Sequence, residues 1–431
     1  MGKKILILYA VSALLGALTG IVASVFQLAI IKLDHFLVSF FHFIVKQGWP
    51  AGIFSSFLSM LMVLIAWLAV KYIAPEGGGS GVPEIEGALL HQRPILWKQL
   101  LPVKFFFGIV AISSKMVVGR EGPTIQMGGN LGKMLGELFQ LPIKRCDTLI
   151  AAGAAAGLAA AFNAPLAGVL FVMEEMRNQF NYSFINFKMV MICCVMATIT
   201  LHWFMGSAPA IEMQLFDLPS LSSLWLFLLF GIMVGFAGLL FNFTLVTLLN
   251  HLDKVSPKFK LYYVLLVGLL VGTLAYYYPP SIGGGYVIIN QALMMTPTFG
   301  VLCNLLIIRF ITTMLSYSTG IPGGIFAPIL ALGTLLGLAA FQMFDYFIVD
   351  LSVHPGMFAV AGMGALFAAS VRAPITGVVL VVEMTQNYSL ILPLLITCIT
   401  STTVMQLARN EPIYTQLLDR ALLLSAKLRM K

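Results

Sequence analysis

Glycine and proline cluster at four places inside otherwise apolar sequence. The clusters read GGGSGVPEIEG at 77–87, GREGPTIQMGG at 119–129, SIGGGYV at 281–287 and GIPGGIFAP at 320–328. Such residues break helices, and irregular backbone at membrane depth is tolerated only where protein buries it or where it lines a wet cavity. The four clusters are therefore candidate walls of a pathway through a membrane.

The same clusters offer chemistry for anions. Proline in GSGVP and GREGP suits a first helical turn, which leaves unpaired backbone N–H groups at the helix start, and the amides of Ile325 and Phe326 in GIFAP would be free in the same way. Helix N-termini carry partial positive charge, so several that point to one place bind an anion weakly enough to release it. Close helix packing remains an alternative for any single cluster. A nucleotide-phosphate loop is disfavoured because no GKS or GKT follows the glycines.

A few acidic residues interrupt the apolar segments, and each costs about 2.5–3.5 kcal/mol at the membrane centre. Glu121 lies at the predicted helix start in GREGP, where its carboxylate could occupy the anion site and leave it when protonated. Anion passage would then be coupled to protons. The alternative is that Glu121 merely caps the helix or pairs with Arg120.

The elements that must position these residues are membrane helices. The 431-residue chain is 59% apolar and only 10% charged, which excludes an ordinary soluble protein. We expect a single all-α transmembrane domain over 1–431. Apolar stretches that could span a bilayer recur at 5–31, 51–73, 99–118, 148–173, 187–205, 223–249, 261–278, 299–315, 325–348, 357–383 and 390–407.

The net charge of +8 does not indicate a nucleic-acid partner, because the basic residues gather at both ends and in short connectors. This pattern follows the positive-inside rule and predicts a multi-pass protein with both termini in the cytoplasm. Lys3 and Lys4 before the first apolar run resemble a signal peptide, but the run is too long for one, so we expect no cleavage. Cysteines and histidines show no ligand spacing, so no metal and no cofactor are expected.

An internal repeat organises the chain. Residues 153–174 (GAAAGLAAAFNAPLAGVLFVME) match residues 362–383 (GMGALFAASVRAPITGVVLVVE), and upstream of them GREGP pairs with GIFAP. Inverted halves of a transporter bring equivalent broken helices together near the membrane midplane. We expect repeat 1 over about 1–205 and repeat 2 over about 222–415.

The repeat also separates two neighbouring acids. Glu174 matches Glu383 and therefore looks structural, whereas Glu175 faces Met384 in the alignment. An unmatched acid is the better candidate for a role that one half alone performs, such as delivering protons.

The chain resembles the CLC family of chloride channels and transporters, most closely its prokaryotic proton-coupled members. The resemblance rests on four segments that look like the signature blocks of the family and follow in the same order: GSGVPEIEG, GREGPTIQMGG, FNAPLAGVLFVMEE and GIPGGIFAP. The resemblance covers essentially the whole chain. It implies the CLC fold, in which two inverted-topology repeats carry broken, re-entrant helices. It also implies a homodimer with one pathway per subunit, placed in a bacterial inner membrane.

The resemblance implies ligands for chloride. Ser80 corresponds to the serine whose hydroxyl binds the central anion and favours chloride over nitrate, and Tyr414 resembles the tyrosine that supplies a second hydroxyl from the inner side. Ile325 and Phe326 would give backbone amides to the same ion.

It also implies an external anion site and a proton route. Arg120 and Gly122 would offer amides to the external site, where Glu121 resembles the gating glutamate that accepts protons. Glu175 resembles the internal proton-transfer glutamate, which channel members of the family typically lack.

We therefore predict a chloride/proton antiporter, a secondary active transporter rather than an enzyme, with chloride and protons as its substrates and the lipid bilayer as its surroundings. A passive CLC-type chloride channel is the alternative. An intramembrane enzyme is disfavoured because the apolar segments hold no paired aspartates, no Ser and His arrangement and no zinc spacing. A purely structural scaffold leaves the glycine clusters unexplained.

Two departures from the family pattern stand out. The chain ends 17 residues after Tyr414, so the cytoplasmic CBS domains of eukaryotic members are not expected. Lys115 stands where glycine is usual; it could stabilise the ionised carboxylate of Glu121, or its side chain could snorkel outward, and we favour the second.

Overall fold

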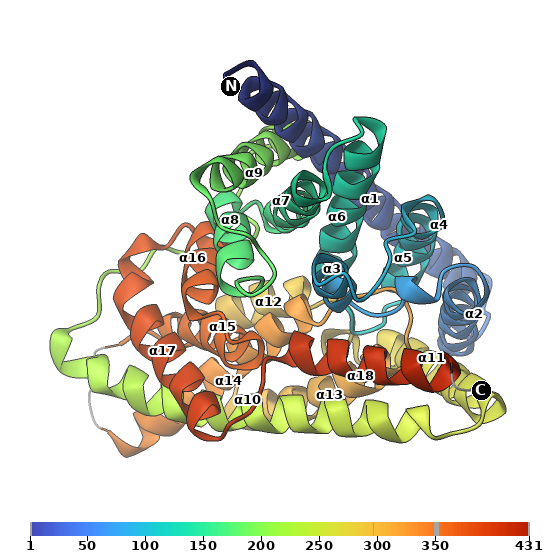
Figure 1. The fold of residues 1–431 in the computed structure, drawn as a ribbon. Coiled ribbons are helices and arrows are strands. Elements are labelled where there is room, and N and C mark those ends of the chain that lie inside the picture. Colours follow the sequence, from blue (N-terminus) through green and yellow to red (C-terminus); the bar gives the residue numbers. More distant parts are fainter. Residues whose placement is uncertain (1, 296, 349–352, 430–431) are drawn as a thin grey trace.

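The computed structural model describes residues 2–295, 297–348 and 353–429, and it folds most of them into helices (Figure 1). The first half contains α1 (Gly2–Lys46), α2 (Ala51–Tyr72), α3 (Val82–Leu89), α4 (Trp97–Pro102), a π-helical turn (Val103–Phe107), α5 (Gly108–Ser113), α6 (Glu121–Leu138), α7 (Ile143–Phe162), α8 (Pro165–Glu174) and α9 (Phe184–Met205). The second half contains α10 (Leu224–Asp253), α11 (Pro257–Tyr277), α12 (Tyr286–Met295), α13 (Phe299–Ser318), α14 (Phe326–Phe347), α15 (Pro355–Val371), α16 (Pro374–Thr385), α17 (Ile391–Leu407) and α18 (Ile413–Arg429). Short 3₁₀ turns lie at Pro75–Gly77, Leu221–Ser223, Pro279–Ser281 and Tyr388–Leu390.

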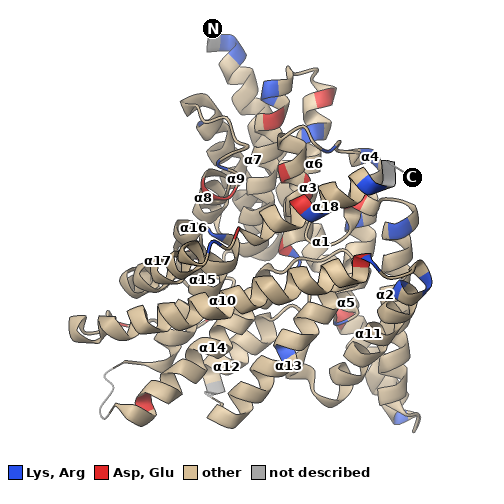
Figure 2. Ribbon diagram, turned by 60° about the horizontal axis from the view of Figure 1, so that its bottom comes forward, with Lys and Arg blue, Asp and Glu red and all other residues tan. Residues whose placement is uncertain are grey.

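These helices are those of a multi-pass membrane protein. Within the described ranges, nine are long and apolar enough to cross a bilayer, and most of the ribbon in Figure 2 carries neither an acidic nor a basic side chain. The first helix is longer than the stretch predicted at 5–31, because no glycine or proline interrupts the sequence between Gly20 and Gly48. At 1.5 Å per residue its 45 residues extend roughly 68 Å, about twice the thickness of the hydrocarbon core.

Two of the predicted spans are wrong as single segments. The run 148–173 divides into α7 and α8, and the run 357–383 divides into α15 and α16. Asn163 (φ 54°) and Arg372 (φ 68°) end the first helix of each pair in the left-handed conformation, and a proline then begins the second helix. Hydropathy alone cannot detect these breaks, because the residues on both sides are equally apolar.

The two halves of the chain repeat one packing arrangement. In Figure 1 most of the blue-to-green helices of the first half lie above the yellow-to-red helices of the second, and α2 lies beside α11. Within the first half, α6 and α7 touch at Gly128 and Gly153; within the second, α14 and α15 touch at Gly333 and Gly362. A Cβ atom added to Gly128 would lie 2.0 Å from the carbonyl oxygen of Gly153, and one added to Gly333 would lie 2.3 Å from that of Gly362. These glycines let the helices of each pair meet backbone to backbone.

The halves join through two reciprocal carboxylate contacts between α8 and α16. Glu174, at the end of α8, accepts hydrogen bonds from the amides of Ile375 (3.0 Å) and Thr376 (2.7 Å) at the start of α16. Glu383, near the end of α16, accepts from the amides of Leu166 (3.1 Å) and Ala167 (2.8 Å) at the start of α8. Each carboxylate therefore satisfies the free N–H groups of the opposite helix. This is the structural role predicted for Glu174.

The glycine contact between α6 and α7 yields a stability prediction. Gly128→Ala places a methyl group against the Gly153 carbonyl, so we expect the free energy of unfolding to fall by about 1–3 kcal/mol. Thermal unfolding of the purified protein in detergent measures the loss. Gly300→Ala is the matched control, because no atom lies within 4 Å of its added Cβ. Equal unfolding temperatures for the two variants would contradict the prediction.

Candidate functional site

Three of the glycine clusters meet at one point, where backbone hydrogen bonds tie them together. The amide of Gly79 donates to the carbonyl of Ile321 (3.0 Å), and the amide of Gly323 donates back to Gly79 (3.1 Å). Gly119 and Gly324 exchange amide-to-carbonyl bonds of 2.7 and 2.8 Å. These bonds fix the segments that lead into α3, α6 and α14, so the starts of the three helices are held side by side.

A buried lysine completes the support of the first cluster. Lys104, in the π-helical turn, is fully buried and donates from Nζ to the carbonyls of Gly77 (3.0 Å) and Gly79 (2.7 Å). Lys104 was not among the residues predicted from the sequence. The sequence nevertheless contains a signal for Lys104, since an ionisable side chain inside the apolar run PVKFFF needs a functional or structural reason.

The fourth cluster has a support of the same kind. Arg309 of α13 is fully buried, and its guanidinium donates to the carbonyls of Pro280 (3.2 Å), Ile282 (3.0 Å) and Gly283 (2.9 Å). It was also missed, although it interrupts the apolar sequence LLIIRFIT. Lys104 and Arg309 thus donate hydrogen bonds to carbonyl oxygens of non-helical backbone, for which lipid offers no donor.

Two hydroxyl groups converge where α3, α14 and α18 begin. Ser80 and Tyr414 are almost completely buried and lie next to each other, and among the residues that the structure describes neither Ser80 Oγ nor the Tyr414 hydroxyl reaches a partner at full hydrogen-bonding geometry. Gly122 packs directly on this serine, since a Cβ atom there would lie 2.5 Å from Ser80 Oγ. Buried hydroxyls are ordinarily paired. Two unpaired ones beside helix N-termini form a site that suits a small anion.

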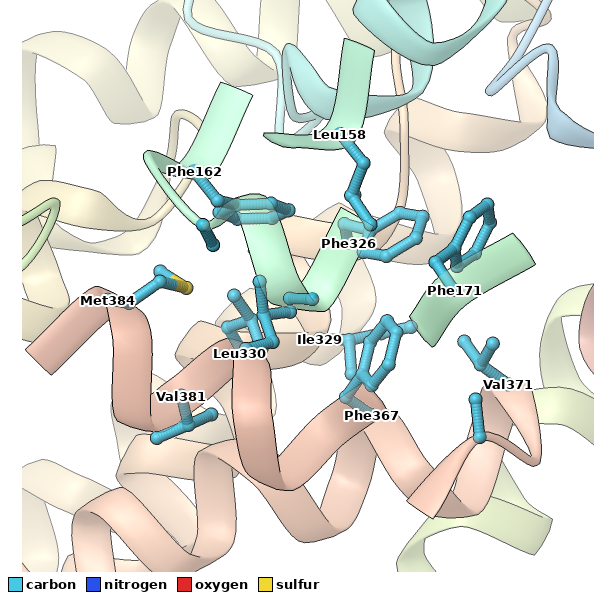
Figure 3. Packing of buried hydrophobic residues seen from close by; sticks show 14 of the residues in the cluster. Leu158, Phe162, Phe171, Phe326, Ile329, Leu330, Phe367, Val371, Val381 and Met384 are labelled. Atoms are coloured by element: carbon cyan, nitrogen blue, oxygen red, sulfur yellow. The ribbon is translucent and has the colours of Figure 1, made fainter. Parts of the chain in front are cut away.

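Phe326 forms an apolar wall next to these hydroxyls. Its ring is fully buried and lies 5.8 Å from the Tyr414 ring and 4.9 Å from that of Phe367. Figure 3 shows the ring surrounded by Leu158, Phe162 and Phe171. Phe326 is also the first residue of α14 and Ile325 precedes it, so their amides belong to the unpaired N–H groups of the helix start.

Glu121, the first residue of α6, is fully buried above this site. Its Oε1 atom accepts a hydrogen bond from the hydroxyl of Tyr286 (3.0 Å). The backbone amides of Glu121 and Ala327 face the carboxylate, but Oε2 reaches no donor at hydrogen-bonding geometry. Oε2 lies over Gly119, where a side chain would overlap it. The carboxylate thus occupies the junction between the starts of α6 and α14.

Arg120 does not form an ion pair with Glu121 within the residues described. Its guanidinium lies 4.9 Å from the centre of the Tyr286 ring, in a cation–π contact. Tyr286 was not among the residues singled out from the sequence, because nothing in SIGGGYV identifies a partner 165 residues away. Lys115 does not contact Glu121 either: its Nζ pairs with Asp34 of α1 at 2.9 Å, which is neither of the two roles considered for it.

Glu175 lies apart from Glu121, beside a second acid. Glu86 of α3 is fully buried, and neither of its carboxyl oxygens reaches a donor at full hydrogen-bonding geometry within the described part of the chain; the half-buried side chain of Glu175 is its neighbour. Both of these acids are charged neighbours of the Tyr414 hydroxyl. Glu86 was missed, although it is an acid in the middle of GVPEIEGALL.

A cavity of about 370 Å³ reaches Ser80 from the side of α18. Its lining includes Gly79 and Tyr317, whose hydroxyl accepts a 3.4 Å hydrogen bond from the Ser80 amide. Arg93, Lys260 and Arg420 also line it, together with the carboxylates of Glu84 and Asp253. Three cations against two carboxylates leave a positive balance, which attracts anions to the mouth of a cleft.

Known proteins match this chain over most of its length. Residues 61–406 match the family model described as voltage gated chloride channel. A protein of Vibrio parahaemolyticus named H(+)/Cl(−) exchange transporter ClcA is 44% identical over 417 residues, covering 95% of this chain and 89% of that relative. The protein of the same name from Vibrio cholerae is 45% identical with the same coverage. The solved structure of a slow cyanobacterial Cl⁻/H⁺ antiporter is 36% identical, superposes with a TM-score of 0.92, and covers 96% of this chain and 98% of that one.

The buried lysine of the site supplies a prediction. Lys104→Met removes the donor from the carbonyls of Gly77 and Gly79, each of which costs about 1–3 kcal/mol when left unpaired, and so loosens the segment that leads into Ser80. We expect a lower unfolding temperature and weaker chloride binding by titration calorimetry. Lys133→Met is the control, because that lysine is partly exposed and pairs with Glu137 across one helical turn. Wild-type stability and affinity in Lys104→Met would show that the segment holds its shape without the lysine.

Proposed function

Because the chain belongs to the CLC family, we propose that it exchanges chloride for protons across a membrane. The observation that carries the proposal is the position of Glu121: its carboxylate is buried where the amides of two helix starts converge. An ionised carboxylate in that place competes with the anion for the amides of the helix starts. A protonated carboxyl group is neutral, so it is no longer attracted to these amides and can move away. The relatives at 44–45% identity carry the name of a proton/chloride exchanger.

Chloride is proposed to bind between Ser80, Tyr414 and the start of α14. The two hydroxyls would donate to the ion, and the amides of Ile325 and Phe326 would complete its shell. Support comes from the two buried hydroxyls themselves, for which the described residues offer no other hydrogen-bond partner. The amides of Arg120 and Gly122, at the start of α6, are proposed to serve a more external ion. No full positive charge touches either site in this scheme, so the ions can leave again.

Protons are proposed to take a second route on the far side of the hydroxyls. Glu121 would receive protons from outside, and Glu175 would exchange them with the cytoplasm. Glu86 supports this assignment, since two adjacent carboxyl groups can hold one proton between them. The scheme alternates between an ionised Glu121 that closes the anion path and a protonated Glu121 that opens it.

The placement of the chain is part of the proposal. We propose two repeats, about 1–205 and 222–415, in a homodimer with one pathway per subunit, set in a bacterial inner membrane with both termini in the cytoplasm. The paired glycine contacts and the reciprocal contacts of Glu174 and Glu383 support the division. The bacterial origin of the similar exchangers supports the membrane.

Reconstituted vesicles test the exchange itself. Vesicles loaded with concentrated chloride are diluted into low chloride at equal pH, with valinomycin and potassium to dissipate the membrane potential. Outward chloride flow should drive protons inward, so that the external medium becomes alkaline. Chloride release without any change in pH would overturn antiport and leave the passive channel, and protein-free vesicles give the background.

Three glutamine substitutions test the roles of the acids. Glu121→Gln and Glu175→Gln should each abolish proton movement while chloride still passes, because glutamine cannot carry the proton. Glu174→Gln is the matched control, since that residue caps α16 and is not part of the proposed proton route. Parallel pH-electrode and chloride-electrode recordings measure both ions. Normal proton transport in Glu175→Gln would assign the relay to another group.

A further inference from the structure

Tyr286 makes the hydrogen bond that holds the Glu121 carboxylate in the anion pathway. Tyr286 is the first residue of α12 and lies half-buried, and its hydroxyl is 3.0 Å from Glu121 Oε1. A phenol donating to a carboxylate forms a charge-assisted hydrogen bond, which is markedly stronger than the same bond to a neutral carboxylic acid. The contact therefore favours the ionised, pathway-blocking state of Glu121 over the protonated one.

The surrounding structure fixes the direction of this phenol. Arg309 holds the three carbonyls that precede α12, and the amide of Gly283 donates to the carbonyl of Lys115 (3.0 Å) just upstream of Glu121. Gly285 takes φ +114°, a conformation that side chains rarely adopt, and it turns the chain directly into Tyr286. The guanidinium of Arg120 covers the ring face. The ring of Tyr286 is thus held in place by its own segment and by Arg120, the residue next to Glu121.

We propose that Tyr286 is a latch: a positioning residue that keeps ionised Glu121 in the pathway and thereby sets how acidic the solution must be before the gate opens. The inference rests on the proposed gating role of Glu121. Among the described residues, the groups that face the carboxylate are the charged Arg120 just before α6, the hydroxyl of Tyr286 on α12, and the backbone amides of Glu121 and of Ala327 on α14.

The experiment compares chloride flux against pH for the wild type and Tyr286→Phe in reconstituted vesicles. Loss of the hydroxyl makes protonation of Glu121 easier, so the pH midpoint of chloride flux should move upward by about one unit, and flux at neutral pH should rise roughly tenfold. Tyr262→Phe, which removes an exposed hydroxyl on α11, should leave the midpoint unchanged.

A double-mutant cycle separates the latch from a merely structural effect. In a Glu121→Ala background there is no carboxylate to hold, so adding Tyr286→Phe should change neither the flux nor its pH dependence. A wild-type midpoint in Tyr286→Phe, or the same change with and without Glu121, would overturn the inference. Thermal unfolding of each variant confirms that the folded protein is compared. Chloride flux reports the latch even if protons are not transported, so failure of antiport and failure of the latch are distinguishable.

Discussion

The structure depends on one constraint: backbone that leaves a helix at membrane depth must find partners within the protein. The four glycine clusters break helices there, and their polar groups are divided into two sets. The carbonyls are bound, by Lys104, by Arg309 and by the exchanges between Gly119 and Gly324. The amides at the starts of α6 and α14 are left for an anion or for the carboxylate of Glu121. The proposed anion pathway uses the amides that remain once the carbonyls have been satisfied.

This division explains why buried cations support the pathway without lining it. A lysine ammonium in contact with the ion would bind it too firmly for passage. Lys104 instead donates to the carbonyls behind Ser80, and Arg309 donates to those behind Tyr286. Lys104 and Arg309 therefore act on the anion indirectly. They fix the shape of the backbone around it and do not contact the ion. The groups proposed to touch the ion are hydroxyls and amides, which are neutral.

The sequence predicted the fold class and singled out the residues that the structure brings together at the proposed anion site, because both depend on local signals. Glycines before a proline mark helix starts, and the repeat brings GREGP and GIFAP together. The contacts that could not be predicted join residues that lie far apart in the sequence. Nothing near Tyr286 indicates Glu121, nothing near Lys115 indicates Asp34, and Glu86 is visible as an isolated acid but not as the neighbour of Glu175. Breaks at Asn163 and Arg372 were missed because hydropathy does not change across them.

The crossed contacts of Glu174 and Glu383 have the form of a two-fold interface. In a two-fold interface between identical subunits, if residue i of one touches residue j of the other, then j touches i. The contacts between α8 and α16 obey that rule inside a single chain. Two identical subunits would carry the same residue at both copies of a position. In a single chain the two copies are encoded separately, so one copy can be Glu175 while its counterpart is Met384. The proposed proton route, which uses Glu175 on one side only, requires that separation.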